Sequence, residues 1–219
     1  MRTDVGKPER ASQNRVLQLF QSMGYTYLGD WEEEVRTQPV EENTLKDHLL
    51  SQGYSEVLIQ KAIDKFVSAT INLSSGLYEA NKQVYQLLRY GVTLREELGK
   101  AKETVWLIDW KDIESNQFAV AEEVTFQGRH TKRPDIVIYV NGIALGVIEL
   151  KRSKVGVEQG IRQNLDNQKE MFIPKFFAAM QLVMAGNDSQ GLRYGTIETP
   201  EKFYLTWKEE SDKEFDYVL

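Results

Sequence analysis

The sequence predicts a fold of the α+β (mixed α/β) class, with helices in its first half and a sheet in its second. Up to about residue 92, apolar residues recur every three or four positions, as on one face of a helix. After about residue 100, short apolar runs rich in β-branched and aromatic residues replace that spacing. The helical spacing returns once, at about 156–170, between two groups of such runs. We therefore expect a helical region at about 10–92 and a sheet core at about 100–219.

Four helices are expected in the helical region, and each combines an apolar stripe with a residue that begins or ends a helix. Asn43 and Ser55 are suited to cap the second and third helices through their side-chain oxygens. Glycines follow the first, second and fourth helices, where they favour termination. The expected helices cover residues 16–24, 43–53, 55–66 and 77–90.

Two apolar runs indicate central strands of the sheet. Residues 135–140 (DIVIYV) and 143–150 (IALGVIEL) are almost continuously apolar, which is typical of strands covered on both faces. Asn141-Gly142 lies between them and favours a tight turn. We expect a mostly antiparallel sheet, whose other strands cover residues 104–110, 117–126, 178–186, 192–197 and 202–207.

Composition excludes several kinds of site. The 219 residues contain no cysteine and only two histidines, His48 and His130, which excludes disulfides, thiolate metal sites and a histidine-rich zinc site. The sequence shows no signal peptide and no run of about 20 apolar residues. We therefore expect a soluble protein of the reducing cytoplasm with no membrane contact.

The distribution of charge matters more than its total. A formal net charge of −6 argues against a protein that binds DNA nonspecifically on its own. Basic residues nonetheless gather at 129–133 and 151–154, on either side of the two central strands. A local positive region on an acidic protein can hold a phosphate, because exposed charges beyond about 10 Å are screened at moderate salt. Ordinary solvated loops are the other interpretation of these clusters.

Charged residues stand at the ends of the two central strands. Asp135 opens the first strand, and Glu149 and Lys151 close the second. A carboxylate beside a buried strand costs on the order of several kcal/mol unless it is paired or bound to a cation, and Mg²⁺ prefers carboxylate oxygens. We predict that Asp135, Glu149 and the Leu150 carbonyl hold Mg²⁺, while Lys151 positions the attacking water or stabilises charge at a phosphodiester. A surface ion pair at a strand end is the other interpretation.

Strand geometry tests this prediction, because residues two positions apart share a face of a strand. Glu149 and Lys151 therefore project together, and Leu150 points the other way, into the core. The position of Asp135 depends on the connection between the strands.

With a plain two-residue turn at 141–142, Asp135 would face Ile148 and lie on the wrong side of the sheet. A three-residue connection, or a β-bulge near Gly146, would set Asp135 directly opposite Glu149. We expect one of these two arrangements.

The residues at these strand ends resemble the PD-(D/E)xK nuclease signature. Arg133-Pro134-Asp135 is followed by Glu149-Leu150-Lys151, and nucleases with this signature share an αβββαβ core with the acids on a central hairpin. The longer run at 133–152 resembles the nuclease domain of type I restriction endonuclease restriction (R) subunits. Other stretches that resemble this family are QNRVLQLFQSMGYTYLGDW, RYGV, TVWLIDW, GIRQNLDNQ and LRYGTIETPEKFYLTWKEE.

The resemblance, which covers nearly the whole chain, implies a restriction-endonuclease-like αβββαβ core with an inserted or preceding helical lobe. It implies a Mg²⁺-dependent type I site-specific deoxyribonuclease that cleaves double-stranded DNA and accepts Mn²⁺ in place of Mg²⁺. In this family the nuclease is the N-terminal domain of a larger subunit, which continues into ATP-driven translocase domains and assembles with modification and specificity subunits. Because the sequence has no Gly-x-x-x-x-Gly-Lys-Ser/Thr loop, we expect ATP to bind only to the translocase.

The resemblance also points to residues outside the signature. Members of the family often carry Gln-x-x-x-Tyr on the next helix; Gln163 matches it, and Asn167 stands where the tyrosine is expected. Gln163 is expected either to reach the metal-site water or a phosphate, or to be an ordinary solvated residue. Some relatives use an acid of the first helix as a metal ligand, and Glu9, Gln13 and Glu79 are candidates with none preferred. Phosphate contacts are expected from Lys132, Arg133, Arg152 and Lys154.

Two other functions remain open at this point. The acidic, amphipathic helices at about 43–90 would suit a module that docks onto the translocase or modification subunits and has weak or no nuclease activity of its own. A stand-alone repair nuclease of the same fold is the second. Neither composition nor motif spacing separates them from the restriction enzyme.

Overall fold

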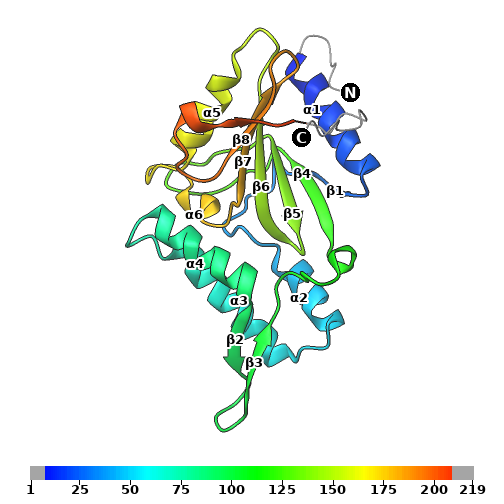
Figure 1. Ribbon diagram of the computed structural model, residues 1–219, viewed down its shortest axis with the longest axis vertical. Helices are drawn as coiled ribbons and strands as arrows, with labels where there is room; N and C mark the ends of the chain where they lie inside the picture. Colours follow the sequence, from blue (N-terminus) through cyan, green and yellow to red (C-terminus); the bar gives the residue numbers. More distant parts are fainter. Residues whose placement is uncertain (1–7, 209–219) are drawn as a thin grey trace, which may run out of the picture.

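The computed structural model describes residues 8–208 and is built on a seven-stranded sheet in the order β1-β4-β5-β6-β7-β8-β9 (Figure 1). The β1–β4 and β6–β7 pairs run parallel and the other neighbours antiparallel, so the predicted mixed, mostly antiparallel fold is confirmed. The strands are β1 (Thr26–Asp30), β4 (Phe118–Glu122), β5 (Ile136–Val140), β6 (Ile143–Leu150), β7 (Leu182–Asn187), β8 (Gly191–Gly195) and β9 (Leu205–Thr206).

Helices cover both faces of the central strands, which is why β5 and β6 are almost continuously apolar. On one face, α1 (Pro8–Ser22) packs Leu17 against Ile148 and Leu150. On the other face, α5 (Val157–Asn167) packs against β6 and β7, followed by the short α6 (Pro174–Phe177). The sheet is therefore the middle layer of a three-layer arrangement.

A helical lobe extends from one end of this sheet (Figure 1). It contains α2 (Glu42–Ser51), α3 (Glu56–Ile71), α4 (Leu77–Tyr90) and a separate hairpin of β2 (Val92–Arg95) and β3 (Lys102–Val105). Phe66 of α3 is fully buried at its centre. The cap that Ser55 provides to α3 is confirmed, since its side chain accepts a hydrogen bond from the Leu58 N–H. Buried residues connect the lobe to the sheet in one continuous core.

The β5–β6 turn is buried where the lobe meets the sheet. Asn141 and Gly142 both have positive φ (52° and 80°), as the expected tight turn requires. The Asn141 amide donates to the Leu107 carbonyl at 3.0 Å. A Cβ on Gly142 would lie 2.7 Å from the Glu41 carbonyl oxygen, so glycine is needed for close approach as well as for φ. Asp135 and Glu149 lie at the opposite end of this hairpin.

Several predicted elements are wrong in detail. The run at 104–110 belongs mostly to an irregular segment whose Leu107 and Ile108 fill the core between lobe and sheet, and its strand part pairs with β2 instead of the main sheet. Asn43 lies inside α2, whose N-cap is Glu41. Residues 178–181 precede β7 and are not extended strand. Strand β1 was not expected at all.

The described part of the chain includes no helix with the length and apolar character needed to cross a membrane.

Candidate active site

A β-bulge brings Asp135 to the same place as Glu149. The turn is a two-residue connection, with Val140 paired to Ile143, but the register shifts between Ile138 and Tyr139. Tyr139 pairs with Ala144 and Ile138 with Gly146, so Leu145 is the extra residue. Beyond the shift, Ile136 pairs with Ile148, which sets Asp135 across from Glu149. The predicted bulge beside Gly146 is therefore confirmed, and the longer connection is excluded.

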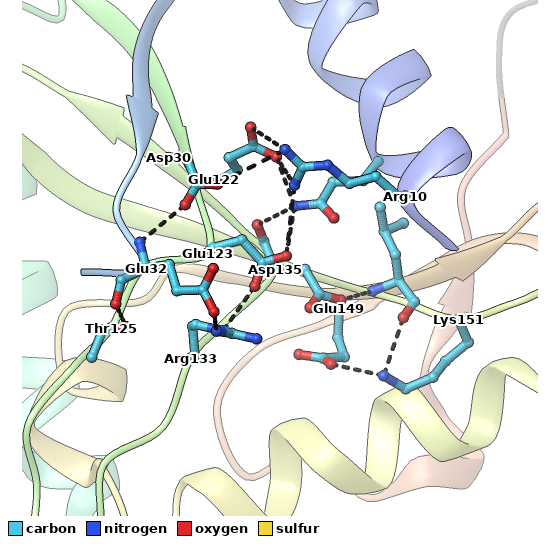
Figure 2. A network of polar contacts seen from close by, with 12 residues as sticks. Arg10, Asp30, Glu32, Glu122, Glu123, Thr125, Arg133, Asp135, Glu149 and Lys151 are labelled. Carbon is cyan, nitrogen blue, oxygen red and sulfur yellow. Dashed lines mark hydrogen bonds and ion pairs between the residues drawn. The ribbon is translucent and has the colours of Figure 1, made fainter. Parts of the chain in front are cut away.

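Three side chains converge at this end of the hairpin (Figure 2). Asp135 Oδ2 accepts a hydrogen bond from the Leu150 N–H at 2.6 Å. Lys151 Nζ donates to Glu149 Oε1 at 2.7 Å and to the Leu150 carbonyl oxygen at 3.1 Å. The predicted common face of Glu149 and Lys151 is thus present, and Leu150 packs into the core under α1.

Glu149 is in an electrostatically costly position. It is 1% exposed, and its Oε2 has no hydrogen-bond partner. Burial, reinforced by the charge of Asp135, raises the pKa of Glu149 to about 8, although the Lys151 ammonium acts in the opposite direction. Removing a carboxylate from water is unfavourable unless a proton or a cation compensates it. When Glu149 is ionised, Lys151 alone therefore does not compensate its charge.

These residues fit a divalent cation. A buried oxygen of Glu149 lacks a partner, a second carboxylate lies beside it, and the Leu150 carbonyl is within the same cluster. Hard cations such as Mg²⁺ take such oxygen ligands and leave the remaining positions to water and phosphate. The described residues contain no group of three or more His, Asp or Glu side chains placed to hold a metal. The predicted set of two carboxylates and one carbonyl therefore supplies the candidate ligands for a divalent cation.

The α5 residues lie beside this cluster. A Cβ on Gly160 would be 3.4 Å from the Glu149 carbonyl oxygen and 3.5 Å from Lys151 Cγ, so the helix passes directly over the end of β6. Gln163 is half-buried one turn further along α5. Asn167, which replaces the expected tyrosine, is 1% exposed and its Oδ1 has no partner.

The four predicted phosphate contacts lie in different surroundings. Arg152 and Lys154 are exposed in the loop between β6 and α5. Lys132 places Nζ 4.0 Å from the centre of the Phe172 ring. Arg133 forms ion pairs with Glu32 and, at 2.8 Å, with Glu123. Of the four, Arg152 and Lys154 lie nearest in sequence to Lys151, on an exposed loop.

The three candidates for an additional metal ligand lie in different parts of the chain. The Glu9 side chain lies outside the described residues. Glu79 lies on α4 of the lobe, where it pairs with Lys82 at 3.6 Å. Gln13 lies on α1 and is 3% exposed, with its amide directed at the loop that carries Asp135.

A network of charged residues next to Asp135 was not predicted (Figure 2). Glu122 ends β4 and is 3% exposed; Arg10 of α1 binds it with two hydrogen bonds, of 2.6 and 3.0 Å. Tyr27 of β1 donates to Glu122 Oε1 at 2.5 Å. Glu123 follows, with an unusual positive φ of 50°. The signal in the sequence is the same as for Asp135 and Glu149, an apolar strand that ends in acids.

Comparison with known proteins identifies the family of this chain. A model of the family described as "Type I restriction enzyme R protein N terminus" matches residues 7–202. The chain belongs to this family. The relatives named below are described as endonuclease subunits of type I restriction enzymes, and the predicted resemblance to the N-terminal domain of R subunits is confirmed.

Three relatives illustrate the match. The "putative type I restriction enzyme MjaVIIIP endonuclease subunit" of Methanocaldococcus jannaschii is 27% identical over 94% of this chain and 20% of its own length. The HindI endonuclease subunit of Haemophilus influenzae is 29% identical over 71% of the chain and 15% of its length. The EcoprrI endonuclease subunit of Escherichia coli is 28% identical over 48% and 36%. The chain spans about a fifth of the length of the first of these relatives.

Proposed function

We propose that this chain is the metal-dependent DNA-cleaving domain of a type I restriction enzyme, and that Asp135, Glu149 and Lys151 form its active site. The observation that carries the proposal is the bulge in β6, which sets Asp135 opposite a buried Glu149 whose Oε2 has no partner. Holding two ionised carboxylates together in this way is unfavourable unless a proton or a cation compensates their charge. Membership of the R protein family supplies the reaction class.

The carboxylates of Asp135 and Glu149 and the Leu150 carbonyl would hold Mg²⁺, with Mn²⁺ as a substitute. Bound there, the cation supplies a Lewis acid for the scissile phosphate and lowers the pKa of a bound water. The chain's part is to fix the ligands: the Leu150 N–H orients the Asp135 carboxylate, and Lys151 orients that of Glu149.

Lys151 has a second role at the phosphate. Its ammonium donates to Glu149 Oε1 and to the Leu150 carbonyl, which fixes its position beside the two carboxylates. A donor fixed in this way stabilises the charge that develops on the phosphate oxygens. Gln163 of α5 is a further candidate to contact the attacking water, and Arg152 and Lys154 to contact DNA phosphates.

The test uses Asp135→Ala, Glu149→Ala and Lys151→Ala in the complete endonuclease subunit, assembled with modification and specificity subunits. Each change is expected to abolish DNA cleavage while ATP hydrolysis by the translocase continues. Asp166→Ala is the matched control, because it removes an exposed α5 carboxylate that pairs only locally with Lys169. Cleavage that persists in all three site variants would remove the proposal.

A second candidate function is docking onto another subunit, and one observation favours it. Where the lobe meets the sheet, Tyr85, Trp110 and Ile113 are 47%, 48% and 61% exposed and line an apolar hollow of about 250 Å³. Exposed apolar surface of this kind often marks a protein contact. Trp110→Ala with Ile113→Ser would then block assembly and leave the metal site unchanged. Normal assembly would exclude this contact.

A further inference from the structure

Gln13 is a buried polar residue that contacts the main chain of Asp135. It lies on the α1 face that packs on the sheet and is 3% exposed. Its Nε2 donates to Glu122 Oε2 at 2.9 Å, to Glu123 Oε1 at 3.2 Å and to the Asp135 carbonyl oxygen at 3.3 Å. One amide nitrogen therefore connects the end of β4 with the residue that opens β5.

The Asp135 carbonyl and the ionised carboxylates of Glu122 and Glu123 can only accept hydrogen bonds, so an amide nitrogen suits this place and a carboxylate does not. The Asp135 carbonyl also accepts from the Glu123 N–H at 2.9 Å. Glu123 reaches that position through a left-handed backbone, with φ of 50°. Backbone strain of this kind persists where surrounding contacts hold it, often at functional sites.

Asp135 is thus fixed at both ends. Its carbonyl is held by Gln13 and Glu123, and its carboxylate by the Leu150 N–H. Arg10 pairs with Glu122 and limits the charge that accumulates around the Gln13 amide. Movement of α1 away from the sheet would release the first of these restraints.

We propose that Gln13 is a positioning residue for Asp135, an inference that rests on the proposed function. It acts through the Asp135 main chain and does not itself touch the cation or DNA. Residues that orient metal ligands typically contribute 10- to 100-fold to metal affinity. The same loss in Mn²⁺ affinity is expected when the Gln13 amide is removed.

The experiment measures Mn²⁺ binding to the complete 219-residue chain by electron paramagnetic resonance of the free ion, with no DNA present. Gln13→Met removes the donors at similar length, and Gln13→Glu places a carboxylate against Glu122 and Glu123. Ser12→Ala is the matched control, because Ser12 is also buried on α1 but bonds to Asp188 at 2.7 Å. Asp135→Asn removes a proposed ligand and so measures the Mn²⁺ binding that occurs without the proposed site.

Both Gln13 variants are expected to weaken Mn²⁺ binding about 10- to 100-fold, with Ser12→Ala close to wild type. If Gln13→Met does not fold by circular dichroism, Gln13→Asn takes its place, since the shorter side chain also withdraws the amide. If the folded Gln13 variants bind Mn²⁺ as tightly as wild type while Asp135→Asn does not, the role of Gln13 is refuted and the proposed metal site stands. Equal binding by wild type and Asp135→Asn would instead overturn the proposed metal site, and the inference with it.

Discussion

Without a metal, Glu149 is expected to make the protein less stable as the pH rises, and Glu149→Gln should remove most of that dependence. Burial and the neighbouring Asp135 raise the pKa of Glu149 from 4.5 to about 8. The unfolded chain releases this proton near pH 4.5 and the folded chain only near pH 8. Between these values folding takes up a proton, so the stability is present below pH 4.5 and is lost as the pH rises to about 8.

The magnitude follows from the size of the pKa difference. Each pKa unit corresponds to about 1.4 kcal/mol, so full ionisation of Glu149 costs up to about 5 kcal/mol of folding free energy. Because the side chain is 1% exposed, solvent screening does little to reduce this figure. Glu149→Gln keeps an acceptor for Lys151 and removes the titration, so its advantage over wild type should grow towards alkaline pH.

Urea unfolding in the presence of a chelator, at pH 5 and pH 9, measures this effect. The free energy of unfolding of Glu149→Gln relative to wild type should increase by several kcal/mol between the two values, up to the limit of about 5. Glu103→Gln is the matched control, since it removes a carboxylate from the exposed face of β3, where substitutions usually change stability by less than about 0.5 kcal/mol. Parallel pH profiles for wild type and Glu149→Gln would refute the reasoning.

Three further predictions concern metal binding, the turn and the network. Mn²⁺ at about 100 times its dissociation constant should raise the free energy of unfolding by about 2.7 kcal/mol, seen in thermal unfolding, and Asp135→Asn should abolish the increase. Gly142→Ala should lower the free energy of unfolding, measured in urea, by more than Gly191→Ala does. Both glycines have positive φ, but of the two only Gly142 would place a Cβ 2.7 Å from a backbone atom. Equal losses of stability would contradict this contact. Tyr27→Phe should lower the free energy of unfolding by about 1–2 kcal/mol, because it removes the hydrogen bond to Glu122. No loss of stability would show that water replaces this bond.

The central hairpin was predictable because its signals are local. Two apolar runs around Asn141-Gly142 define β5 and β6, and side-chain alternation places Glu149 and Lys151 on one face. The bulge was predicted only as one of two solutions. The choice depends on packing, since Gly142 must fit against α2 while Ile136 and Ile148 must face α1.

The remaining differences come from contacts that are distant in sequence. Strand β1 is short and mostly exposed, and it pairs in parallel with β4, more than 90 residues further along the chain. The run at 104–110 is apolar because it fills the core between lobe and sheet. An irregular segment that is buried in this way has the same composition as a strand. The Arg10–Glu122 and Gln13–Asp135 contacts join α1 to strand ends more than 100 residues away. No local spacing carries that information.

The proposed active site requires a cation bound between Asp135 and Glu149. Crystals of the chain soaked in Mn²⁺ and measured at the manganese absorption edge test this without reference to activity. We predict one anomalous peak within bonding distance of both carboxylates and the Leu150 carbonyl oxygen, and no such peak in crystals of Glu149→Gln. A fully soaked wild-type crystal with no peak there, or with the same peak in the variant, would contradict the proposed active site.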